Sequence, residues 1–113
     1  MSLTVRMAAE EYRDGTVVTL ALTGEADAAS VDVLDEVIVR AEREHGQAMD
    51  ELRFDLSDLS YISSAGLRSL VVAHQRLGRA VRIVLTGASA EVAETIRLTG
   101  FHNAVVLREA GFR

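Results

Sequence analysis

The expected fold depends most on residues 52–70, which read LRFDLSDLSYISSAGLRSL. Leu52, Phe54 and Leu56 alternate with polar residues, which is the period of a strand with one buried face. Farther along, apolar residues recur at the spacing of one helix face, at Leu67, Leu70, Val71 and Leu77. The stretch therefore predicts a strand over 52–56, a polar turn over 57–64, and a helix that ends at Gly78.

Two adjacent serines, Ser63 and Ser64, stand where the predicted turn meets the predicted helix. Either one suits the N-cap position, because a serine hydroxyl can accept a hydrogen bond from an unpaired N–H of the first turn. That end of a helix also favours negative charge. The residues alone leave open whether Ser64 only caps the helix or also forms a functional site.

Composition predicts a single domain that covers residues 1–113. The chain is 49% hydrophobic, which is enough for a packed core, and it has no cysteine for disulfides or thiolate metal sites. A net charge of −5 and 4% aromatic residues argue against a nucleic-acid partner. No apolar run is long enough to span a membrane, and residues 1–12 do not resemble a signal peptide. We therefore expect a cytoplasmic location and no membrane partner.

The rest of the chain alternates between strand and helix patterns. Helices are expected to end at Gly46, Gly78 and Gly100, the first of them capped by Asp27 or Ser30, and residues 47–50 and 109–113 are expected to be a polar link and a frayed tail. Strands are expected over residues 3–9, 16–23, 52–56, 81–85 and 104–107. The order β-β-α-β-α-β-α-β predicts an α/β fold with a mixed sheet of four to five strands and helices packed on it.

The residues give little support to an enzyme. His45, His74 and His102 show no metal-ligand spacing, so no metal and no cofactor are expected. A hydrolase elbow needs glycine two residues before its serine, and Ile62 stands there before Ser64. The chain has arginine but no lysine, so the lysine of a phosphate-binding loop is absent.

Two carboxylates follow predicted strands. Asp27 and Asp58 are expected near the carboxyl ends of their strands, where binding sites gather in open α/β sheets. Turn formation alone would also explain both residues.

The segment 54–70, FDLSDLSYISSAGLRSL, resembles the signature of the STAS domain, specifically that of the bacterial anti-sigma factor antagonists. The sequence Gly24-Glu25-Ala26-Asp27 is similar to the family's G-E-L-D, and Ile96–Gly100 is similar to its late L-x-x-x-G. Two positions differ, since Ser63 stands where the family usually has aspartate and Ala65 where it has serine or threonine. The resemblance covers nearly the whole chain.

The resemblance implies a non-enzymatic antagonist that captures an anti-sigma factor with serine kinase activity. The kinase would phosphorylate Ser64, or Ser63 as the alternative acceptor, and a serine phosphatase would reset the switch. The expected partner-binding face comprises Asp27, Asp58, Ser63, Ser64, Ala65, Gly66, Arg68, Ser69 and Gln75, with Arg68, Ser69 and Gln75 on the exposed side of the helix. The small residues Ala65 and Gly66 would leave the serine accessible, or would serve tight helix–strand packing.

Two alternatives remain. One is a STAS interaction module without phosphorylation, such as a scaffold or a lipid-transport accessory subunit, in which Ser64 is only a cap. The other is a small nucleotide-binding protein or enzyme that uses Ser64 as nucleophile or phosphate ligand.

Overall fold

A computed structural model describes residues 2–111 and confirms the expected order of elements. The three helices are α1 (Val31–His45), α2 (Ser64–Leu77) and α3 (Ala90–Leu98), with short 3-10 turns over Gly78–Ala80 and Phe101–Asn103. The five strands are β1 (Leu3–Tyr12), β2 (Gly15–Ala26), β3 (Met49–Ile62), β4 (Arg82–Ala88) and β5 (Val106–Glu109). Among the described residues, no helix is long and apolar enough to cross a membrane.

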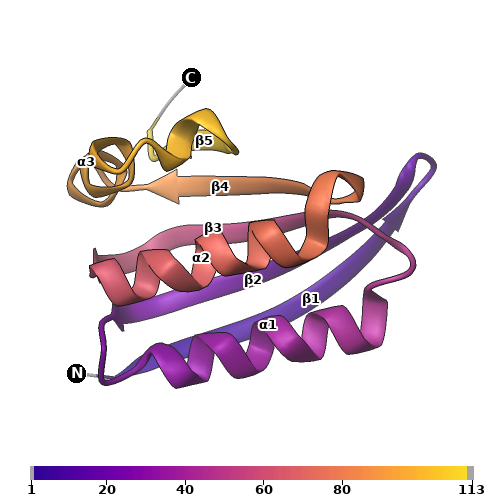
Figure 1. The fold of residues 1–113 in the computed structure, drawn as a ribbon, viewed down its shortest axis with the longest axis horizontal. Coiled ribbons are helices and arrows are strands. Elements are labelled where there is room, and N and C mark those ends of the chain that lie inside the picture. The colour runs from indigo at the N-terminus through magenta and orange to yellow at the C-terminus, as the bar shows by residue number, and fades with distance from the viewer. Residues whose placement is uncertain (1, 112–113) are drawn as a thin grey trace.

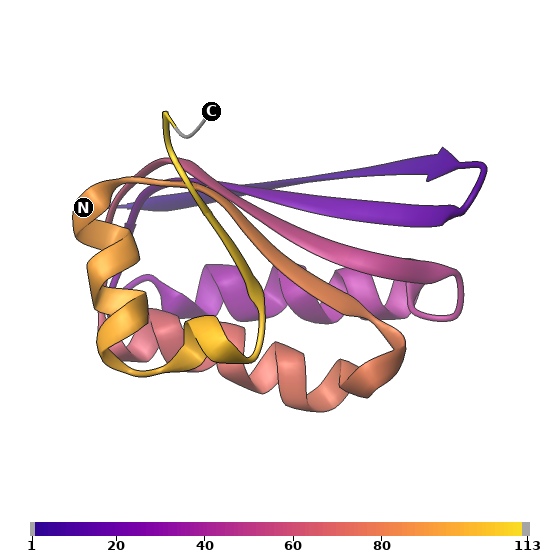
Figure 2. The same ribbon diagram turned by 90° about the horizontal axis from the view of Figure 1, so that it is seen from above.

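The sheet is mixed, as the sequence predicts, and its strands follow chain order, β1-β2-β3-β4-β5. The hairpin pairs β1 and β2 antiparallel, and the other neighbouring strands pair parallel. The helices lie on one side of the sheet, with α1 and α2 side by side along the strands (Figures 1 and 2). One face of the sheet therefore carries the helices, and the carboxyl ends of β2 and β3 lie together where α1 and α2 begin.

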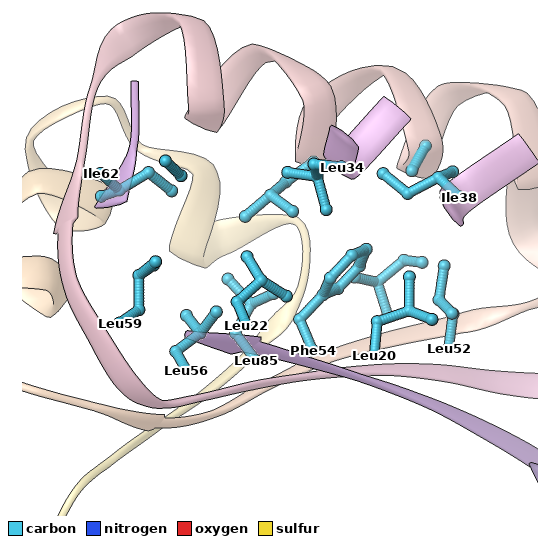
Figure 3. Packing of buried hydrophobic residues seen from close by; sticks show 14 of the residues in the cluster. Leu20, Leu22, Leu34, Ile38, Leu52, Phe54, Leu56, Leu59, Ile62 and Leu85 are labelled. Carbon is cyan, nitrogen blue, oxygen red and sulfur yellow. The ribbon is translucent and has the colours of Figure 1, made fainter. Parts of the chain in front are cut away.

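The core fills the space between the sheet and its helices (Figure 3). Leu20 and Phe54 are fully buried, and they project from neighbouring strands toward Leu34 and Ile38 of α1. Buried and less buried residues alternate along β2 and the first part of β3, which is the pattern of strands that bury one face, whereas residues 83–85 of β4 are all buried.

Strand β3 is much longer than expected: residues 47–48 form the predicted link, but residues 49–50 already belong to the strand, and the turn predicted over 57–64 is largely wrong. The strand runs from Met49 to Ile62, because β2 continues to pair with it across three register shifts. Leu59 and Ile62 remain in the core, while the polar residues between them lie at the surface. Irregular pairing of this kind permits two polar residues in a row, Ser57 and Asp58, which breaks the alternation read from the sequence.

The last strand also lies later than expected, at Val106–Glu109, so Glu109 belongs to β5 and not to a frayed tail. Its backbone register pairs Leu107 with Leu85 and Glu109 with Ala88. Phe112 and Arg113 of the predicted tail lie outside the described residues.

Candidate functional site

The candidate site forms where β2 and β3 end side by side. The last residues of the two strands, Ala26 and Ile62, are register partners. The next residue, Ser63, donates its backbone N–H to the Ala26 carbonyl oxygen at 2.9 Å. Strand pairing thus places the loop after β2 directly beside the first turn of α2, although Ala26 and Ser63 are 37 residues apart.

Ser63 is the N-cap of α2, which settles the choice that the sequence left open. Its backbone is extended, and its Oγ accepts a hydrogen bond from the Gly66 N–H at 3.2 Å. The same hydroxyl lies 3.0 Å from the Ala26 carbonyl oxygen, to which it donates. The Ser63 side chain is therefore half-buried and already engaged by the fold.

Ser64 is the first residue of α2 and is exposed. The helix keeps its cap without this residue, because Ser63 supplies the hydroxyl that the first turn requires. Of the two adjacent serines, Ser64 thus offers the more accessible hydroxyl.

Gly66 and Ala65 have different structural roles. Gly66 is buried, and a Cβ added there would lie 2.6 Å from the Ala26 carbonyl oxygen and 2.9 Å from the Ala26 Cβ. Glycine is therefore required at this position so that α2 can pack against β2. Tight helix–strand packing is one of the two roles expected for it. Ala65 is half-buried and lines a groove on the surface.

Asp27 shapes the loop between β2 and α1. Its Oδ1 accepts backbone hydrogen bonds from Ala29 and Ser30, each at 3.1 Å, and it lies 2.9 Å from the Ser30 Oγ. Ser30 is the N-cap residue of α1 by position, but its side chain makes no cap hydrogen bond. Asp27 therefore orders this loop, and its role in partner binding stays a prediction.

An open groove of about 600 Å³ runs between α1 and α2. Its α1 side includes Val31, Asp35 and Val39, and its α2 side includes Ser64, Arg68 and Val72. Val39 and Val72 are about two-fifths exposed, so the groove that Ser64 lines also offers accessible apolar surface. Sequence reasoning missed the α1 contribution, because the periodicity of one helix does not reveal which helix lies beside it.

The structure corrects two expectations about the predicted partner face. Ser69 is only 6% exposed, so it does not lie on the exposed side of α2. Asp58 lies within β3, four residues before Ile62, and so it does not stand at the carboxyl end of the strand. Arg68 and Gln75 are exposed as expected, but of these two only Arg68 lines the groove with Ser64.

The family model of the STAS domain, which describes the sequences of that family, matches residues 8–110. The chain therefore belongs to the STAS family. A comparison with curated proteins found no match. The family assignment agrees with the expectation that the chain is not an enzyme, since antagonists of this family are non-enzymatic regulators.

Solved structures of anti-sigma factor antagonists share the fold. A protein of this class from Mycobacterium paratuberculosis is 23% identical with a TM-score of 0.76, over 93% of this chain and 86% of that one. A putative one from Thermotoga maritima is 16% identical with a TM-score of 0.74, over 91% and 86%. The phosphorylated form of SpoIIAA from Bacillus is 19% identical with a TM-score of 0.63, over 90% of each chain.

Proposed function

We propose that this protein is a bacterial anti-sigma factor antagonist that regulates transcription by partner switching in the cytoplasm. In its unmodified form it binds an anti-sigma factor with serine kinase activity. Phosphorylation of Ser64 ends that binding, and a serine phosphatase restores it. The observation that carries the proposal is that the two serines have different roles. Ser63 caps α2, whereas Ser64 is exposed and lines an accessible groove with apolar surface.

The proposal has a physical basis in the position of Ser64. A phosphoserine carries a charge of about −1.5 to −2 near neutral pH. At the first turn of a helix that charge is tolerated, because it meets unpaired N–H groups and the positive end of the dipole. Modification should therefore leave the fold intact while it places a bulky anion at the mouth of the α1–α2 groove, where like charge or desolvation weakens partner binding.

Support also comes from the structural neighbours. The fold is shared with several anti-sigma factor antagonists, and one of them, the Bacillus protein SpoIIAA, exists in a phosphorylated form. That modification belongs to SpoIIAA, and its transfer to Ser64 is part of the proposal.

The test is incubation with ATP and the cognate anti-sigma factor kinase, followed by mass spectrometry of the wild type, Ser64→Ala and Ser63→Ala. We expect phosphate in the wild type and in Ser63→Ala, and none in Ser64→Ala. Equal incorporation into Ser64→Ala would refute the assignment of the acceptor. Partner binding that persists in Ser64→Glu at wild-type strength would favour a module without a phosphorylation switch.

A further inference from the structure

Ser64 and Arg68 stand four residues apart on α2, and both line the α1–α2 groove. Residues at this spacing lie on one face of a helix, with their Cβ atoms about 5–6 Å apart. An arginine side chain can reach back over one turn to meet a group on the earlier residue. The geometry therefore places a guanidinium within reach of any group attached to the Ser64 hydroxyl.

Arg68 differs from the other arginine of the groove. Arg76 also lines it, and its Nη2 lies 3.2 Å from Glu42 Oε1 in an ion pair. Between residues 2 and 111, Arg68 belongs to none of the ion pairs, although Asp35 lines the same groove from α1. The exposed Arg68 side chain thus needs to break no ion pair within this range in order to take up a new anion.

We propose that Arg68 is the intramolecular partner of a phosphate on Ser64 and holds it against the α2 side of the groove. This inference rests on the proposed function and specifies its regulation. A guanidinium suits the role because its N–H groups can donate two parallel hydrogen bonds to phosphate oxygens. The modified state is then a defined arrangement in which the phosphate lies against the first turns of α2, between Ser64 and Arg68, at one end of the groove.

Besides Arg68, the charged residues that line the groove are Asp35 and Arg76. Asp35, facing the groove from α1, repels the phosphate dianion, and Arg76 lies twelve residues farther along α2, roughly 18 Å away along the helix axis. The N–H groups of the first turn attract the phosphate regardless of residue 68. A substitution of Arg68 therefore isolates the guanidinium, while the contribution of the helix end stays constant.

The test uses the full chain with phosphoserine incorporated at position 64 during translation, and follows the ³¹P chemical shift against pH. A nearby cation favours the dianion, so Arg68 lowers the second pKa of the phosphate, which is about 6 in general. We expect Arg68→Gln to raise this pKa by about 0.2–0.4 units, the equivalent of one exposed i,i+4 ion pair. The matched control Arg76→Gln should titrate as the wild type does.

Two further measurements sharpen the result. The difference between wild type and Arg68→Gln should shrink in about 1 M salt, because the pair is exposed to solvent. Arg68→Lys should keep part of the effect, since it keeps the charge but loses the forked geometry. Equal phosphate pKa values in the wild type and Arg68→Gln would overturn the proposal, and so would equal shifts in Arg68→Gln and Arg76→Gln.

This experiment separates the inference from the proposed function, because the phosphoserine is installed without a kinase. If the kinase never modifies Ser64 while the Arg68-dependent pKa difference is present, only the proposed function fails. If the kinase modifies Ser64 and the pKa difference is absent, only the pairing with Arg68 fails.

Discussion

Replacing Ser63 by alanine should destabilise the fold, whereas the same change at Ser64 should not. The Ser63 hydroxyl accepts the Gly66 N–H at 3.2 Å and lies 3.0 Å from the Ala26 carbonyl oxygen. Losing an N-cap serine costs about 0.5–2 kcal/mol. The Ala26 oxygen stays paired in Ser63→Ala, because it still accepts the Ser63 backbone N–H at 2.9 Å. The Gly66 N–H, however, loses its side-chain acceptor, and Gly66 is buried.

We therefore expect a loss of about 1–2 kcal/mol for Ser63→Ala, toward the upper end of the cap range because the donor residue, Gly66, is buried. For a domain of this size, that corresponds to a thermal midpoint lower by roughly 4–10 °C. Ser64→Ala should change the free energy of unfolding by less than about 0.5 kcal/mol, since its side chain is exposed and alanine favours a helix.

Urea denaturation followed by circular dichroism measures both variants against the wild type, with scanning calorimetry as a second readout. The two substitutions remove the same hydroxyl from adjacent residues, so each is the control for the other. The assignment of the cap is wrong if Ser64→Ala loses more stability than Ser63→Ala. It is also wrong if both variants unfold at the wild-type midpoint.

Three further predictions concern the frame of the site. Gly66→Ala should cost about 1–3 kcal/mol by overpacking against Ala26, despite the higher helix propensity of alanine, and an unchanged urea midpoint would mean that α2 can shift from β2 without penalty. Asp27→Ala should cost about 1 kcal/mol by removing the carboxylate that accepts from the Ala29 and Ser30 N–H groups, of which only Ser30 keeps another acceptor in the loop, and Asp27→Asn should restore most of this stability in the same assay. Phe54→Ala should cost about 3–5 kcal/mol in calorimetry, because its ring is fully buried, and a loss below about 1 kcal/mol would contradict the packing of the core.

Local patterns along the chain determined the order of the elements. The alternation of Leu52, Phe54 and Leu56 and the helical spacing after Leu67 depend only on near neighbours, and the structure confirms the strand and the helix that they predict. The motif of residues 54–70 also pointed to the STAS family, to which the family comparison assigns the chain. These properties are carried by short segments, and so they can be read without knowing how the segments pack.

Tertiary structure decided what depends on residues far apart in the chain. Strand β3 extends to Ile62 because β2 pairs with it, and no local pattern within residues 57–62 reports that pairing. The hydroxyl of Ser63, which caps α2, has a second partner in the distant Ala26 carbonyl oxygen, and only strand pairing brings that oxygen beside it. Ser69 is buried and the groove exists because α1 lies next to α2. The sequence identified two candidate serines at the start of α2. Packing between distant elements engages the Ser63 hydroxyl in hydrogen bonds within the fold and leaves Ser64 at the surface.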